Sequence, residues 1–338
     1  MKIPPYIILL ITILLSGCYG NKPSESNIIF ESGAYPSAIC HKGMYYYMMQ
    51  IDRCDTLFLF ASPDIRTLVR GQKRMIMRIP GSGMHNIYSP EIHRINNRWY
   101  VYCEADDGGN TDNHELYVFE NTSDDPMTGE WVKHGPIVTN KEWNFGLHPS
   151  PLVVNDRLYL FWSGWPKRRI ENETQCIYIA EMSDPWTLKS ERVVISEPEY
   201  EWERQWINPD GTRTAYPIFV NENPQPMISP DGSNVIVPYS ASGIWTVYNS
   251  LGILYASANS DLLNPKSWVK MPEPQFIPDE NAEIYGTSNI SVVPDCNSDS
   301  YYLMYQAKHK DTQGHEHSDV RIKEMHWNDQ GFPEFGKP

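Results

Sequence analysis

Short runs of strand-forming residues recur along the chain in five pairs, and this repeat constrains the fold more than any other feature. The runs are rich in Tyr, Val, Ile, Leu and Phe, and a turn with Gly, Asn or Asp precedes the first run of each pair. A short apolar segment also stands before every pair. The pairs are residues 44–50 with 56–61, 98–103 with 115–120, 157–162 with 176–182, 234–239 with 251–256, and 301–306 with 320–325.

This repeat predicts an all-β fold that is built as a five-bladed β-propeller. Units of about 50–80 residues with three or four strands and no helix are typical of propeller blades. No amphipathic helix of three turns occurs in the sequence. The 11 Trp and 21 Tyr among 338 residues suit such sheets, and aromatic faces also suit sugar rings. A large β-sandwich with coincidental spacing is the alternative.

The first 17 residues predict a lipoprotein signal peptide. Residues 3–17 are apolar but too short for a normal membrane span, and the small residues Ser16 and Gly17 stand directly before Cys18. This arrangement resembles a bacterial lipoprotein signal, in which the Cys receives the lipid; a chance Cys after an ordinary signal peptide is the alternative. We expect a lipid on Cys18, a tether over residues 18–27 and a propeller over residues 28–338. The domain is then held outside the cytoplasmic membrane of a bacterium, in the periplasm or at the cell surface.

Charge and cysteine content argue against several classes of partner. The formal net charge is −14, with 42 acidic against 28 basic residues, so we expect no nucleic-acid partner. Five cysteines follow Cys18, an odd number that cannot pair completely, and Cys40, Cys103 and Cys176 are expected to be small buried hydrophobes. The cysteine and histidine spacing matches no metal site, so no cofactor is expected. The oxygen-rich segment 106–114 could hold structural Ca²⁺, but it lacks the full EF-hand spacing and a turn is preferred.

Polar residues begin the first strand of each predicted blade, where the strands of a propeller converge on its axis. Four of these five strand entrances contain Pro, which fixes φ and stiffens the backbone. Two carboxylates, an imidazole and a phenol at one centre are groups suited to acid/base chemistry. The residues expected to face the axis are Tyr35, Glu91, His148, Glu222 and Asn289.

Five segments carry motifs that follow one another in a specific order. They are SPEIHRINNRWYVY at residues 89–102, FWSGW at 161–165, QCIYIAEMSDPW at 175–186, VNENPQ at 220–225 and the aromatic run 239–252. Together they resemble glycoside hydrolase family 43, in particular its branch of exo-acting α-L-arabinofuranosidases. The resemblance covers roughly residues 30–338. It implies the five-bladed propeller and an oligosaccharide or polysaccharide substrate that contains arabinose or a related sugar.

The resemblance also implies a catalytic centre, and this chain departs from the family pattern at three of its positions. The family inverts configuration with two Asp and one Glu, and acid and base stand about 6.5–9.5 Å apart so that water fits between them. Its general acid matches Glu222. Its base Asp corresponds to Tyr35, its second Asp to His148, and its axial His, often near a bound cation, to Asn289. A phenol of ordinary pKa is a poor base for water, whereas His148 or Glu91 could serve.

Three functions are compatible with this centre. In the first, a glycosidase acts on an arabinose-containing or related plant-type glycan through a non-standard centre. Glu222 is then the acid, and His148, Glu91 or a Tyr35 nucleophile takes the remaining role. In the second, the protein is a non-catalytic carbohydrate-binding propeller. In the third, a lyase-like enzyme uses Tyr35 and His148 on a uronate-containing glycan, with the basic residues 167–169 near the substrate carboxylate.

Aromatic side chains near the strand entrances predict contacts with a sugar. Trp162, Trp165 and Trp245 are the expected stacking surfaces, and Asn289 is the expected polar contact. Packing within the propeller core is the alternative role for each Trp. The membrane is expected to be a partner only through the lipid on Cys18.

Overall fold

The regular secondary structure of the described residues is mainly β-strand, which confirms the predicted all-β class. The computed structural model describes residues 27–51, 56–79, 81–108, 111–167, 173–207, 213–309 and 318–338. Its helical elements are four short 3₁₀ turns, and none of the described helices has the length and apolar character needed to cross a membrane. They are η1 (Ile65–Arg70), η2 (Thr111–Asn113), η3 (Glu201–Glu203) and η4 (Pro265–Ser267).

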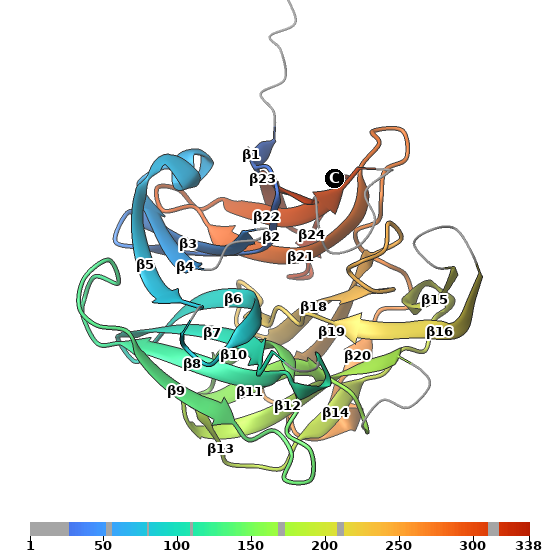
Figure 1. The fold of residues 1–338 in the computed structure, drawn as a ribbon. Coiled ribbons are helices and arrows are strands. Elements are labelled where there is room, and N and C mark those ends of the chain that lie inside the picture. Colours follow the sequence, from blue (N-terminus) through green and yellow to red (C-terminus); the bar gives the residue numbers. More distant parts are fainter. Residues whose placement is uncertain are drawn as a thin grey trace, which may run out of the picture.

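Two four-stranded antiparallel sheets form the first half of the fold, and each contains one of the predicted strand pairs at its centre (Figure 1). The first antiparallel group is β2 (Gly33–His41), β3 (Met44–Ile51), β4 (Thr56–Ser62) and β5 (Gln72–Arg78). The second is β6 (His85–Ile95), β7 (Arg98–Asp106), β8 (Glu115–Asn121) and β9 (Val132–Ile137).

An eleven-stranded sheet contains the third and fourth antiparallel groups. Residues 173–175 of one group pair in parallel with residues 218–220 of the other, and this contact joins them into one hydrogen-bonded sheet. The third group is β10 (Leu147–Val154), β11 (Arg157–Gly164) and β12 (Glu173–Asp184), with β13 (Thr187–Leu188) and β14 (Val193–Ser196). The fourth is β16 (Arg213–Glu222), β18 (Asn234–Ala241), β19 (Ser250–Ser257) and β20 (Val269–Lys270), with β15 (Arg204–Ile207) and β17 (Met227–Ile228).

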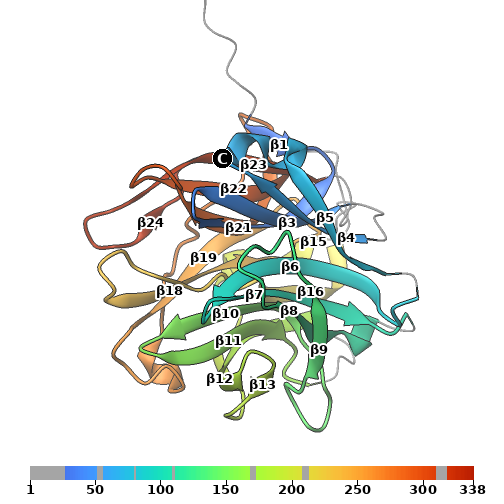
Figure 2. The same ribbon diagram turned by 90° about the vertical axis from the view of Figure 1, so that its left-hand side faces the viewer.

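The fifth antiparallel group joins the two ends of the described chain. Its strands are β21 (Tyr285–Pro294), β22 (Tyr301–Lys308) and β23 (Ser318–Trp327), with β24 (Pro333–Glu334) and the N-terminal β1 (Ile28–Phe30). Figure 1 shows β1 beside β23, and Ile28 is in register with Arg321. In both views the first group lies between this sheet and the second group, because β2 packs against β21 and β6 (Figure 2).

Tight turns connect the first two strands in the first three groups. Each turn has two central residues with positive φ, which is the geometry of the type I′ hairpin that matches the twist of the flanking strands. Gly, Asn and Asp tolerate this left-handed region best, which is why such residues mark these turns in the sequence. The central residues are Lys42 and Gly43, Asn96 and Asn97, and Asn155 and Asp156.

Apolar residues from neighbouring groups meet in five core clusters, and the last cluster joins the fifth group to the first. Tyr47 and Met48 follow one another on β3 yet belong to two different clusters, so this strand buries both faces. The clusters bring together Met48 with Trp99, Tyr102 with Trp162, Phe161 with Val237, Ile253 with Tyr305, and Tyr47 with Met304.

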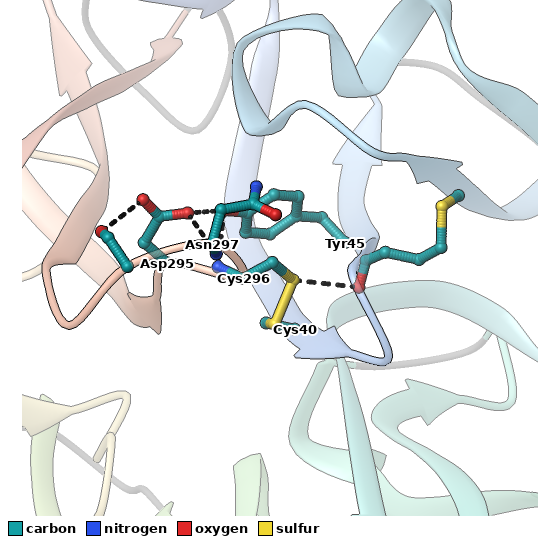
Figure 3. Close-up of a disulfide and its surroundings, with 7 residues drawn as sticks. Cys40, Tyr45, Asp295, Cys296 and Asn297 are labelled. Atoms are coloured by element: carbon teal, nitrogen blue, oxygen red, sulfur yellow. Dashed lines mark hydrogen bonds between the residues drawn. A yellow bond between two sulfur atoms is a disulfide. The ribbon is translucent and has the colours of Figure 1, made fainter.

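A disulfide between Cys40 and Cys296 also joins the first and fifth groups (Figure 3). Cys296 follows β21, and its N–H donates to the hydroxyl of Tyr45, which in turn donates to Asp295 at 2.5 Å. The expectation that Cys40 is a small buried hydrophobe is therefore wrong, because the fold pairs it with a cysteine 256 positions away and leaves it half-buried. Cys103 and Cys176 are free and buried, as predicted.

Candidate active site

A residue with positive φ stands in the first long strand of four antiparallel groups, and in the fourth group it directly follows β16. Four of these residues precede Pro, and all have φ between 40° and 53°, a region that is costly for residues other than Gly. Strand register breaks at the bulge in β2, β6, β10 and β21, so the side chain there leaves the normal alternation of the strand. The five residues are Tyr35, Ser89, His148, Asn223 and Asn289.

Hydrogen bonds fix four of these bulges to the preceding groups, and we call this set the hydrogen-bond ring. At four junctions the bulge N–H donates to a polar side chain on the second long strand of the preceding group, and the polar side chain is buried each time. This repeated contact positions the centre with the backbone, whatever the bulge side chain is. The four pairs are His148 with Glu104 (3.1 Å), Asn223 with Ser163 (2.8 Å), Asn289 with Ser240 (3.2 Å) and Tyr35 with Gln306 (3.4 Å).

Tyr35 and His148 meet at this centre as an aromatic pair. Their ring centroids lie 5.5 Å apart with planes inclined by 28°, and both side chains are buried. Burial raises the pKa of Tyr35 well above its ordinary value, and the nearby carboxylates of Glu222 and Glu104 raise it further. The phenol therefore stays protonated, and the centre holds two carboxyl groups close to it.

Glu104 is the residue of this centre that the sequence analysis misses. It lies on β7 and is 1% exposed; its Oε2 accepts hydrogen bonds from the Ser89 hydroxyl and the His148 N–H. Its Oε1 lies 3.9 Å from Nε2 of His148. Burial raises the pKa of Glu104 to about 7, against the opposing effect of these hydrogen bonds and of His114. The available signal was a carboxylate in the otherwise apolar run 99–105.

Glu222 ends β16 and is buried where the backbone of Ile244 contacts it. It is 1% exposed, and its Oε1 accepts a 2.8 Å hydrogen bond from the N–H of Ile244. The turn that begins at Gly243, where φ is +77°, presents that N–H to the carboxylate. Ile244 and Tyr35 form a small cluster with Ala34, against which Tyr88 and Trp245 pack.

Glu91 and Asn289 belong to a second polar network. The bulge places Ser89, not Glu91, at the position equivalent to Tyr35 and His148, so Glu91 lies two residues farther along β6. Its Oε2 lies 3.0 Å from Nε2 of His93, and its Oε1 accepts a hydrogen bond from Gln225.

The amide of Gln225 connects Glu91 to the remaining residues of this network. It also donates to Asn223 Oδ1 at 3.2 Å, and Asn223 donates to Asn289 Oδ1 at 2.6 Å. Asn289 donates in turn to Gln306 at 2.6 Å. Glu91 and Asn289 are thus linked through amide side chains, and Asn289 is fully buried.

The three predicted stacking surfaces differ in their positions. Trp162 has no exposed surface and packs in the core between the second and third groups, where it stacks on Tyr178. The expectation that Trp162 contacts substrate is therefore wrong, because the side chain is fully buried within this core cluster. Trp165 is buried and stacks on Phe145 with centroids 4.4 Å apart. Trp245 is half-buried over the Tyr35 cluster and keeps exposed surface.

Several predicted features lie outside the described residues. These are the signal peptide over residues 1–17, Cys18, the tether up to residue 26, and Arg168 and Arg169 of the basic loop. In the segment considered for Ca²⁺, Asp106 accepts hydrogen bonds from the Gly108 N–H and from Asn86, as in a turn. Across the described ranges, no group of three or more His, Cys, Asp or Glu side chains is placed to hold a metal ion.

The buried carboxyl and imidazole groups at one centre of this all-β fold are those of an acid/base site, and comparison with known proteins shows the family. A model of the glycosyl hydrolases family 43 matches residues 26–333. The chain is 29% identical to α-L-arabinofuranosidase B of Pyricularia oryzae and 30% identical to an extracellular exo-α-(1→5)-L-arabinofuranosidase of Streptomyces avermitilis. Each alignment covers 93% of this chain and 63% of the relative.

Solved structures agree with the family model. The crystal structure of an α-L-arabinofuranosidase from Lactobacillus brevis is 28% identical, with a TM-score of 0.79 over 93% of this chain and 96% of that one. A thermostable family-43 glycoside hydrolase, 19% identical, shares the fold with a TM-score of 0.71, over 91% of this chain and 94% of that one. The chain belongs to glycosyl hydrolase family 43. It spans less than two thirds of the length of the two curated relatives.

Proposed function

We propose that this protein is a glycosidase that hydrolyses arabinose-containing glycans through a non-standard centre, with Glu222 as the general acid. The observation that carries the proposal is the position of Glu222, which is buried at the centre beside Tyr35 and is held by the Ile244 N–H. A general acid must be fixed next to the leaving oxygen, and a carboxyl group shielded from water suits that role. The relatives named as arabinofuranosidases support the substrate class.

The test is a product screen on arabinan, arabinogalactan and arabinoxylan with wild type and Glu222→Gln. We expect release of arabinose by the wild type and a loss of at least about 100-fold in the variant, because the amide cannot supply a proton. The Gln side chain keeps an oxygen that accepts from Ile244, so the variant should fold. Full activity of Glu222→Gln would remove Glu222 from the mechanism.

A second candidate function is sugar binding without chemistry. The observation that favours it is the replacement of both family aspartates by Tyr35 and His148, which leaves no carboxylate at either position. Calorimetry with arabino-oligosaccharides separates the two functions. Binding without any product over days selects the binding protein, whereas product formation that depends on Glu222 selects the enzyme.

We also propose that the five antiparallel groups are the five blades of a propeller. Five equivalent bulges, five core clusters between consecutive groups and the pairing of β1 with β23 support this interpretation. In this interpretation the eleven-stranded sheet is two blades that share a short parallel contact. An experimental structure with a different number of radial sheets would contradict it.

For location, we propose a lipid anchor at Cys18 that holds the domain outside the cytoplasmic membrane. The disulfide between Cys40 and Cys296 supports export, because such bonds persist in oxidising compartments. Metabolic labelling with a fatty acid tests the anchor. We expect label on the wild type and none on Cys18→Ser, which should move to the soluble fraction; equal labelling of both would contradict the proposal.

A further inference from the structure

Glu104 is an ionisable side chain at a position whose structural role does not require one. At three junctions of the hydrogen-bond ring, the bulge N–H is accepted by the neutral side chains of Ser163, Ser240 and Gln306. At the fourth junction the acceptor is the carboxylate of Glu104. A neutral acceptor therefore satisfies this backbone position. Burying an ionisable group costs stability, so its presence here points to a function beyond the ring.

The second oxygen of Glu104 faces the imidazole of His148. Oε2 of Glu104 accepts hydrogen bonds from the Ser89 hydroxyl and the His148 N–H. Its Oε1 lies 3.9 Å from Nε2 of His148. On the other side of the ring, Nδ1 lies 3.3 Å from the hydroxyl of Ser163. With a proton on Nδ1, Ser163 accepts it and Nε2 presents its lone pair on the side of Glu104. When both nitrogens carry protons, the carboxylate compensates the charge.

We propose that His148 and Glu104 act as one proton-accepting pair for the attacking water, in place of the aspartate base of the family. This inference rests on the proposed glycosidase function. The water oxygen bonds to the anomeric carbon while its proton passes to His148 Nε2, and Glu104 stabilises the resulting imidazolium. The bond from the anomeric carbon to the leaving oxygen breaks, its electron pair stays on that oxygen, and Glu222 supplies the proton. Glu104 touches no reacting atom and is a positioning residue.

The other titratable groups around the pair do not replace it. Burial keeps the phenols of Tyr35 and Tyr88 neutral, because it raises the pKa of both. His114 lies near Glu104 and lowers the pKa of its carboxyl group. The carboxylate of Glu222 raises the pKa of Tyr35, and that of Asp106 raises the pKa of Tyr88.

Glu104→Gln is the first test, and Gln306 shows that an amide fits the equivalent position of the ring. Without the carboxylate the imidazolium loses its partner, so the pKa of His148 falls. We expect the acidic limb of the kcat/KM profile to move to lower pH by about one unit or more, with a loss of about 100-fold at the optimum. Nuclear magnetic resonance of labelled His148, assigned with His148→Gln, should show the same downward shift.

Ser89→Ala is the second test and should act in the opposite direction. The Ser89 hydroxyl stabilises the ionised form of Glu104, so its removal makes the pair hold its proton to higher pH. We expect the acidic limb to move upward. The matched control is Glu120→Gln, which removes a carboxylate 3.2 Å from the imidazole of His134 on the outer strands. That variant should change neither the acidic limb of the kcat/KM profile nor the titration of His148.

The outcomes separate the pair from the proposed function. If Glu104→Gln leaves the titration of His148 and the acidic limb unchanged, the pair is overturned even if the enzyme is active. If the titration depends on Glu104 but the wild type hydrolyses no arabinoside, the glycosidase function is overturned while the coupling of the two side chains stands. Opposite shifts in Glu104→Gln and Ser89→Ala support the inference, since a merely structural defect would not change sign.

Discussion

The phenol of Tyr35 stacks on the imidazole of His148 with ring centroids 5.5 Å apart. These two residues occupy the positions at which the family resemblance implies aspartates, so an uncharged aromatic ring and an imidazole replace two carboxylates. Carboxyl groups are still present at the centre, because Glu104 and Glu222 both raise the pKa of Tyr35. Glu222, at the end of β16, matches the general acid of the family, and Glu104 on β7 is the additional carboxyl group.

The first prediction concerns the stereochemistry of hydrolysis. Because burial and two carboxylates raise the pKa of Tyr35, an attacking phenolate is disfavoured and water is the expected nucleophile. Direct attack by water inverts the anomeric centre, so an α-L-arabinofuranoside should release the β-anomer first. Proton resonance spectra of the product, recorded before mutarotation, measure this. Initial release of the α-anomer would instead indicate a covalent intermediate on Tyr35.

The strand pairs could be predicted from the sequence because their signals are local. Turn pairs such as Asn96 and Asn97, and runs such as residues 98–103, contain their own conformational preference. The bulges could not be predicted from such local signals. Positive φ at Ser89 shifts the register of β6, so the prediction placed Glu91 where the fold places Ser89.

Contacts between distant segments could not be predicted from local sequence patterns. Glu104 reaches the backbone of His148, 44 positions away, and the ring that brings them together depends on neighbouring antiparallel groups. The Cys40–Cys296 bond spans nearly the whole described chain, and an odd cysteine count does not reveal which residues pair. The family motifs located Glu222, yet its hydrogen bond from the Ile244 N–H depends on a turn that only the structure shows.

A second prediction separates the roles of two tryptophans. Trp162→Ala should lower the free energy of unfolding by about 3–5 kcal/mol, because the side chain is fully buried in a core cluster. Trp245→Ala removes a half-buried ring over the Tyr35 cluster and should raise KM about 2- to 10-fold with a smaller effect on stability. Denaturant unfolding and steady-state kinetics measure both effects. An unchanged KM in Trp245→Ala, with Trp245→Phe as the control, would contradict a substrate contact.

A third prediction concerns the disulfide. Cys40 and Cys296 restrain a loop of 256 positions in the unfolded chain, so their replacement by Ser should lower the free energy of unfolding by about 2–5 kcal/mol. The melting temperature should fall by about 3–8 °C. Dithiothreitol should lower the melting temperature of the wild type but not of the double variant, which serves as the matched control. Equal sensitivity of both proteins to the reductant would mean that another group is responsible.

The last prediction follows from the buried carboxyl group of Glu104. Its pKa is about 7 in the folded protein, against about 4.3 in an unfolded chain. Between these values the folded state binds more protons than the unfolded state, so this group makes stability fall as pH rises from about 4.3 to about 7. Glu104→Gln removes this pH-dependent contribution to stability and keeps an acceptor for the His148 N–H. The variant should therefore match the wild type near pH 4 and be the more stable protein at pH 8, by about 1–3 kcal/mol.

Urea unfolding at pH 4, 6 and 8 measures this difference, and Glu181→Gln provides the opposite control. Hydrogen bonds from Arg157 and Lys189 lower the pKa of Glu181 to about 2, so its carboxylate stabilises the fold above about pH 4.3. That variant should be less stable than the wild type at pH 8, and the difference should shrink as pH falls toward 2. If Glu104→Gln were also less stable at pH 8, its carboxylate would be a structural ion pair. A gain in stability together with a loss of hydrolysis would show that the centre keeps this charge for chemistry, at a cost to the fold.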